Sequence, residues 1–171
     1  PTSVGGLEAR LREVCLIPGA GEFVYATDVI HRRDGLTRLT AENVNNGEGR
    51  PDLLVSLDQL QAQLPNLKAV TLVVAWFGTS LDAGACQIRP GVEQATKATL
   101  PWRWTAGGVG RGAAHLISHH EGGPAYGGTP ADRAVLQAIA ELKARGLRVT
   151  LCPFILMDCA GYPWRGRITG E

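Results

Sequence analysis

Two long apolar runs, KAVTLVVAWFG and RVTLCPFILMD, constrain the fold of this chain more than any other feature of its sequence. Aliphatic, β-branched and aromatic side chains dominate residues 69–77 and 148–157, without the regular alternation of a strand that has one face in water. Strands of this kind are covered on both faces and belong to parallel sheets. The sequence therefore predicts two buried, parallel strands.

The segment before the second run has the pattern of a helix from residue 130 to residue 145. Thr129 is placed as its N-cap and Gly146 as the residue just beyond its end. Its inner face is predicted from apolar residues at helical spacing, which are Val135, Ala138, Ile139 and Leu142. A helix joined by a short connection to a buried strand is half of a βαβ unit, so the predicted fold class is α/β, with parallel strands and helices.

The first part of the chain predicts a short helix and a strand. Residues 1–21 are predicted to be an N-terminal linker with a short helix, one face of which carries Leu7, Leu11 and Val14. EFVYATDVI, residues 22–30, follows a Pro-Gly-Ala-Gly turn and is predicted to be the first strand of the main domain, residues 22–171.

A second helix is predicted near Ser56, which has the spacing of a capping box with Gln59. Its buried stripe consists of Leu57, Leu60 and Leu64. Between the first strand and this helix lies a long polar stretch without clear periodicity. Loops of that length often carry function.

Composition narrows the class of protein. The 171 residues, 44% of them hydrophobic, suit one globular domain with a real core. The 17 Lys and Arg nearly balance the 16 Asp and Glu, so no nucleic-acid partner is predicted. No leader and no run of about 18 apolar residues occurs, which predicts neither a signal peptide nor a membrane span. A chain that begins at Pro1 is expected to be an excised or processed piece.

No metal or cofactor is predicted. The four cysteines are scattered without a C-x-x-C pair and are expected to be reduced thiols. His115 and His119 have helical spacing, but no third ligand follows at a standard distance, which favours polar residues near a helix end over zinc. Gly108, Gly110 and Ala113 fit the dinucleotide pattern G-x-G-x-x-A. Because the preceding WRWT is short and half polar, a turn leading into a helix is favoured instead.

Several longer segments carry a resemblance to a known family. They are VTLVVAWFGTSLDAGACQIRPGVE, PAYGGTPADRAVLQAIAELKARGLRVTLCPFILMD, EFVYATDVI and ENVN. Together, from about residue 22 to residue 158, they resemble the large tail-tip ("megatron") proteins of gene transfer agents and related phages. The similar part is the start of their glycoside-hydrolase-like TIM-barrel domain. The resemblance implies a component of a virion or gene-transfer-agent tail tip, produced in the bacterial cytoplasm. Its implied partners are other tail-tip or baseplate proteins and cell-envelope polysaccharide or peptidoglycan.

The number of strands sets a limit on that resemblance. A TIM barrel needs eight strands and about 250 residues, whereas the sequence predicts only three firm strands. The chain is therefore expected to be the first part of a barrel domain, a partial or incomplete barrel that cannot close. An open edge with missing neighbours favours self-association, so a homo-oligomer is also predicted.

The best-placed carboxylate is Asp158, at the carboxyl end of a predicted strand, where barrels place their chemistry. Asp158 is the candidate catalytic residue, with Trp76 and Tyr126 as candidate sugar-stacking residues and Asp28 as a second carboxylate. The alternatives are that Asp158 caps a turn, that Trp76 is core and that Tyr126 anchors a glycine-rich turn. The other tryptophans could stack on sugars or lie in the core; they are Trp102, Trp104 and Trp164.

Two classes of function remain open at this point. One is a fragment of an enzyme that cleaves envelope glycan during delivery of DNA, and the other is a non-catalytic structural or adhesive module of the tail tip. Glycoside hydrolysis needs two facing carboxyl groups. Because the sequence places only Asp158 well, the isolated chain is predicted to lack hydrolase activity.

Overall fold

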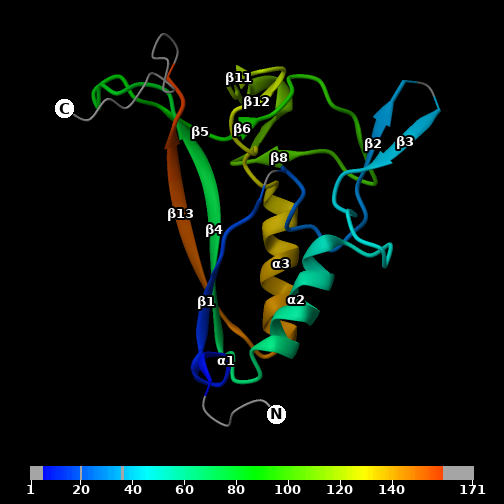
Figure 1. The fold of residues 1–171 in the computed structure, drawn as a ribbon. Helices are drawn as coiled ribbons and strands as arrows, with labels where there is room; N and C mark the ends of the chain where they lie inside the picture. The colour runs from blue at the N-terminus through cyan, green and yellow to red at the C-terminus, as the bar shows by residue number, and fades with distance from the viewer. Residues whose placement is uncertain (1–5, 20, 36, 160–171) are drawn as a thin grey trace.

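The computed structural model describes residues 6–19, 21–35 and 37–159, which form a mixed α/β fold (Figure 1). The helices are α1 (Leu7–Arg10), α2 (Asp52–Gln63) and α3 (Asp132–Ala144), with one 3₁₀-helix, η1 (Arg111–Ala113). The longer strands are β1 (Glu13–Leu16), β2 (His31–Asp34), β3 (Arg38–Ala41), β4 (Ala69–Gly78) and β13 (Arg148–Met157). The two-residue strands are β5 (Ile88–Arg89), β6 (Gly91–Val92), β7 (Thr99–Leu100), β8 (Thr105–Ala106), β9 (Val109–Gly110), β10 (His115–Leu116), β11 (His119–His120) and β12 (Gly123–Pro124).

The main sheet has the order β1-β4-β13, and its three strands are parallel. β4 and β13 pair along their whole length, from Ala69 opposite Arg148 to Gly78 opposite Met157. The two predicted parallel strands and the helix that connects them are thus confirmed. β5 adds a short antiparallel pairing at the carboxyl end of β4.

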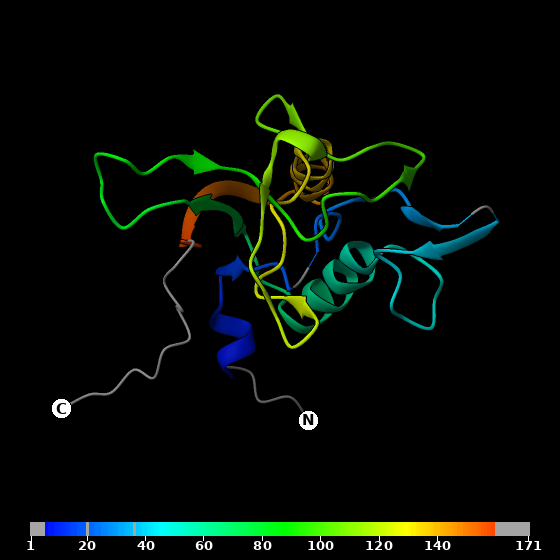
Figure 2. The same cartoon turned by 90° about the horizontal axis from the view of Figure 1, so that it is seen from above.

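Helices α2 and α3 cover one face of this sheet (Figures 1 and 2). Val70, Leu72 and Val74 alternate along β4 toward the helices and join Leu57 of α2 and Leu142 of α3 in one core cluster. The predicted inner face of α3 is confirmed: Ala138 and Leu142 are fully buried, and Val135 and Ile139 pack against the same cluster. Burying a leucine of this kind contributes about 2–3 kcal/mol.

The outer edge of β13 has no partner strand within the described residues. Its side chains are nevertheless large and apolar: Leu151 is 52% exposed, Phe154 51% and Ile155 48%. Leu151 and Ile155 pair with Leu72 and Trp76, so they lie on the helix side of the sheet, whereas Phe154 lies on the opposite side. β13 is therefore largely apolar and only partly covered on both faces, with Val149 packed against the core cluster. The described residues contain no closed barrel, and the sheet is open.

The prediction of a strand at residues 22–30 is wrong. The backbone there forms hydrogen bonds with a side chain and within a turn, and not with a neighbouring strand. The segment turns, with Ala26 N donating to Phe23 O at 2.9 Å. Asn43 accepts from Ile30 N and donates to the carbonyls of Ala26 and Asp28. The apolar content of the segment reflects burial in the core rather than sheet pairing.

The first strand is instead β1, in the segment predicted to end a helix. Helix α1 stops at Arg10, and Leu11 is already extended. Val14 and Leu16 then alternate toward the core, while Cys15 between them is exposed. Val14 fits both a helical stripe and a strand alternation, so the two periodicities could not be separated over so few residues.

Two predicted helix starts are also wrong. α2 begins at Asp52 after Pro51, four residues before Ser56, because the Asp52 carboxylate fixes the preceding loop by accepting hydrogen bonds from Asn45. α3 begins after Ala131 rather than Thr129. The Thr129 hydroxyl accepts a hydrogen bond from Gly91 N at 2.8 Å and is therefore committed to another part of the chain.

Gly146 has a φ of 77° and ends α3 as predicted. All four cysteines are free thiols. No helix in the described ranges has the length and apolar character that crossing a bilayer requires.

Candidate functional site

The candidate site lies where the carboxyl ends of β4 and β13 meet the segment that we call the cap, residues 79–128, which contains the short strands β5 to β12 (Figure 1). Ligand sites of open parallel sheets form at this end of the strands. Gly91 of β6 lies directly on the Phe77 ring, where a Cβ atom would collide with the ring. The cap is thus packed tightly onto the sheet at this point.

Asp158 follows β13 and is held by the cap. Its N–H donates to Gly78 O at 3.0 Å, and its Oδ2 atom accepts from Ser118 N at 2.8 Å and from His115 Nε2 at 2.7 Å. Burial alone would raise the pKa of Asp158, but the hydrogen bonds from Ser118 and His115 outweigh it and hold the pKa below its ordinary value. The carboxylate is therefore ionised near neutral pH although only 1% of the residue is exposed.

The second oxygen of this carboxylate, Asp158 Oδ1, is buried and has no hydrogen-bond partner. It is the only buried side-chain nitrogen or oxygen without one in the part of the chain that the structure describes. An unsatisfied buried acceptor costs about 1–3 kcal/mol. In native proteins such a group goes with local strain, a catalytic role or a bound water or ion.

His115 is the side chain that connects Asp158 to the surface. Because an ionised carboxylate only accepts hydrogen bonds, Nε2 of His115 carries the proton in their contact. The ring stacks on Phe77, with centroids 5.9 Å apart and planes inclined by 28°. About 20% of the side chain is exposed. The pair resembles the carboxylate–imidazole pairs in which a buried acid orients a histidine.

Tyr126, a predicted sugar-stacking residue, lies in the same neighbourhood. Its ring is inclined by 57° to that of Phe77, at a centroid distance of 6.0 Å. Burial raises the pKa of the Tyr126 hydroxyl, and the charges of Asp158 and Cys159 raise it further. The structure thus brings Tyr126 and Asp158 together around Phe77.

Trp76, the other predicted sugar-stacking residue, is not brought to Asp158. Side chains alternate along β4, so Trp76 faces the helix side, while Phe77 and Asp158 face the opposite side. Trp76 packs against the core and against Gly107, where a Cβ atom would collide with its ring. Of the other tryptophans, Trp102 and Trp104 are buried, and Trp164 lies outside the described residues.

Asp28, the second predicted carboxylate, has a structural set of contacts. It accepts hydrogen bonds from Trp102 Nε1 at 2.8 Å and Gln137 Nε2 at 2.7 Å. The bond from Trp102 and then the bond from Gln137 lower its pKa. Asp28 therefore ties the turn after Tyr25 to α3, and no contact connects it with Asp158.

A second polar cluster is buried around Glu22, which is fully buried. Arg111 donates to both Glu22 oxygens, at 2.7 and 2.6 Å, and the Lys97 ammonium lies 3.3 Å from Glu22. Lys97 also pairs with Glu42 and Glu93. Burial would raise the pKa of Glu22, but Arg111 and Lys97 outweigh it and lower the value. The cluster fastens the cap to the core.

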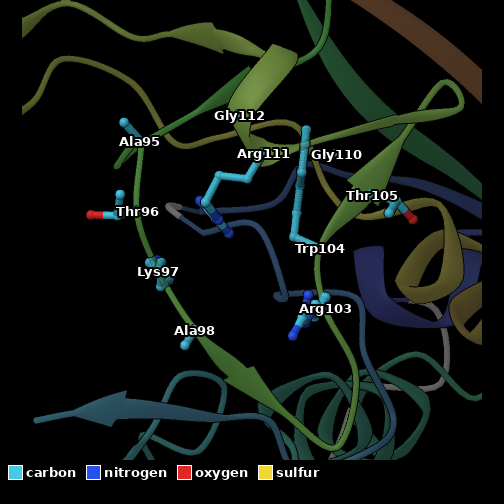
Figure 3. Close-up of a pocket in the computed structure, with 10 residues that line it drawn as sticks. All are labelled: Ala95, Thr96, Lys97, Ala98, Arg103, Trp104, Thr105, Gly110, Arg111 and Gly112. Carbon is cyan, nitrogen blue, oxygen red and sulfur yellow. The ribbon is translucent and has the colours of Figure 1, made fainter.

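A cavity of about 500 Å³ opens beside this cluster, lined by segments 95–98, 103–105 and 110–112, with the Arg111 side chain reaching between the first two (Figure 3). The Arg111 guanidinium lies over the Trp104 ring, 5.5 Å from its centroid. Arg111 is paired with Glu22, and Lys97 is paired with Glu22, Glu42 and Glu93, so the cavity offers little free positive charge for an anion. We therefore place the candidate site at Asp158 rather than here.

The glycine-rich segment has no nucleotide-binding geometry. Gly107 and Gly108, with φ of 57° and 77°, form the turn of a hairpin between β8 and β9. The favoured prediction, a turn into a helix, is wrong in its second half, because only the 3₁₀-helix η1 follows. Among the described residues, no three His, Cys, Asp or Glu side chains are placed to hold a metal ion.

Sequence reasoning missed His115 and Ser118. The predicted helical spacing of His115 and His119 is wrong, since the two residues belong to separate short strands, β10 and β11. His115 and Asp158 are 43 residues apart, and two-residue strands leave no periodicity that could relate them. No sequence signal would have found the pair.

No model of a known protein family matches this sequence, and a comparison with curated proteins finds no match either. The tail-tip assignment therefore stays a prediction from the sequence segments alone.

Proposed function

We propose that this chain is part of a glycoside-hydrolase-like barrel domain in the tail-tip protein of a phage or gene transfer agent, where it engages cell-envelope glycan. The observation that carries the proposal is the open parallel sheet β1-β4-β13, whose helices cover one face and whose carboxyl end carries Asp158, with His115 and Tyr126 of the cap beside it. Parallel strands with helices outside and polar residues at their carboxyl ends are the building plan of barrel enzymes.

The partly covered strand β13 supports the barrel part of the proposal. Leu151 and Ile155 on one side and Phe154 on the other are exposed. A further strand would pair with the free edge of β13, and a helix packed over the two strands would cover Leu151 and Ile155; these two elements are the next βα unit of a barrel. The same surface supports association with neighbouring tail-tip or baseplate proteins or with a second copy.

The site around Asp158 favours binding of glycan without cleavage. A glycosidase needs an acid and a second carboxylate that both reach the scissile bond. Asp158 is 1% exposed, and its Oδ2 atom already accepts two hydrogen bonds. This chain by itself therefore acts as a binding module, and hydrolysis would require carboxylates from elsewhere in the domain.

Co-sedimentation with purified peptidoglycan sacculi tests the proposal. The folded chain should be retained on sacculi and released by soluble peptidoglycan fragments. Because the apolar strand β13 could adhere to any surface, the matched control is Leu151→Ser at an exposed position of that strand. Equal retention of the control is expected, whereas loss of retention in Leu151→Ser, or no retention of the native chain, would count against glycan binding.

A further inference from the structure

The contact between Asp158 and His115 decides which of the two side chains a ligand can reach. Asp158 is 1% exposed, and its hydrogen-bonded oxygen faces Ser118 and His115. The His115 side chain is 20% exposed. A ligand at the carboxyl end of the sheet therefore meets the imidazole before it meets the carboxylate.

The hydrogen bond to Asp158 also determines what His115 offers. In the tautomer with the proton on Nε2, the lone pair of the imidazole lies on Nδ1. Nδ1 has no hydrogen-bond partner in the described residues. Among those residues, Asp158 Oδ1 is the only buried side-chain nitrogen or oxygen without a partner, so Nδ1 is not buried. Nδ1 of His115 therefore reaches solvent as a hydrogen-bond acceptor.

We propose that His115 is the ligand-contacting residue of this site, that its Nδ1 atom accepts a hydrogen bond from a sugar hydroxyl, and that Asp158 is a positioning residue that fixes the ring. The proposal rests on the glycan-binding function proposed above and assigns it to one atom. Phe77 stacks on the imidazole and holds its plane. Tyr126 adds a second aromatic ring beside Phe77.

The surrounding charge selects the class of ligand. The ionised carboxylate of Asp158 disfavours phosphate, sulfate or carboxylate groups next to His115. A metal ion would need further ligands, and no set of three metal-binding side chains is present in the described ranges. A hydroxyl group can donate a hydrogen bond to Nδ1 without repulsion from Asp158 and without further ligands. This points to uncharged sugar units.

Nitrogen NMR of histidine-labelled protein tests the proposal on the native chain. In the free protein, the His115 signals should report the Nε2–H form. Addition of chitotetraose, a tetramer of N-acetylglucosamine, should shift the His115 Nδ1 signal with saturation, while the signals of the exposed His120 stay in place. In Asp158→Asn, the His115 signals should report a mixture of tautomers, and binding should weaken.

His115→Gln is the matched variant, since its amide can donate to Asp158 as Nε2 does but has no group at the Nδ1 position. We expect chitotetraose to bind it about three- to tenfold more weakly, the effect of one lost hydrogen bond, and His120→Gln to bind like the native chain. Binding of chitotetraose without a His115 shift would overturn this inference and leave the proposed function standing. Absence of chitotetraose binding would also overturn it, and retention on sacculi would then decide the proposed function separately.

Discussion

The main sheet with its helices and the cap differ in what holds them together. In the sheet region, long strands pair in register and α2 and α3 bury one continuous apolar cluster. In the cap, strands are two residues long, and single side chains from outside it hold its backbone: Glu22, Thr129 and Asp158 accept hydrogen bonds from cap amides. The sheet region is thus stabilised by a continuous apolar core, and the cap is held in place by individual polar contacts.

This difference gives the two regions different roles. A packed apolar layer is rigid and tolerates little change in volume. Polar contacts at the strand ends can instead present acceptors and aromatic rings to a ligand, which is the role proposed here for His115 and Tyr126. Selective damage to each region should therefore have separable effects.

The largest effect is expected in the sheet region. Leu142→Asp places an unpaired charge at a fully buried position of α3 and should lower the free energy of unfolding by about 4 kcal/mol. Leu136→Asp, on the exposed face of the same helix, should change it by less than about 0.5 kcal/mol. Chemical denaturation of both variants measures this. Similar losses in the two would show that the assigned inner face of α3 is wrong.

An intermediate effect is expected where the cap joins the core. Glu22→Gln removes the buried charge that pairs with Arg111 and, beside Glu42 and Glu93, with Lys97, and should cost about 3 kcal/mol. Hydrogen exchange should locate the loss: the amide of Glu93, which donates to Glu22, should lose protection while the β4–β13 amides keep theirs. The control is Glu48→Gln in an exposed pair with Arg50, expected to cost less than about 0.5 kcal/mol. Uniform loss of protection would mean that cap and sheet unfold as one unit.

The smallest effect is the pH dependence that Asp158 contributes. Its folded-state pKa lies below the ordinary value of 3.8, so its stabilisation is complete above that pH and is lost as the pH falls through the lower folded value. Asp158→Asn should be less stable than the native chain by about 2 kcal/mol at neutral pH, and this gap should narrow on acidification below about pH 4. Denaturation over a pH series measures the gap. A gap that stays constant into acid would contradict an ionised, hydrogen-bonded Asp158.

The same contrast explains how much could be predicted from the sequence. β4 and β13 are apolar runs of ten residues, and α3 keeps an apolar face over thirteen. Patterns of this length in neighbouring residues were enough to predict all three elements. The strand predicted at residues 22–30 was wrong because the Asn43 side chain makes the hydrogen bonds that a neighbouring strand would make. The local sequence does not show this contact, since Asn43 lies outside the segment. Asp158 was predicted from its position at a strand end. Its partner His115 was not, because only the folded cap brings the two together.

The central claim is that the carboxyl end of this sheet binds glycan without cleaving it. The most direct measurement is the release of reducing sugar ends when the purified chain is incubated with sacculi that retain it. The account predicts retention of the protein and no release above that of buffer alone, because Asp158 is buried and already hydrogen-bonded. Release that Asp158→Asn abolishes would contradict the account and make Asp158 a catalytic residue.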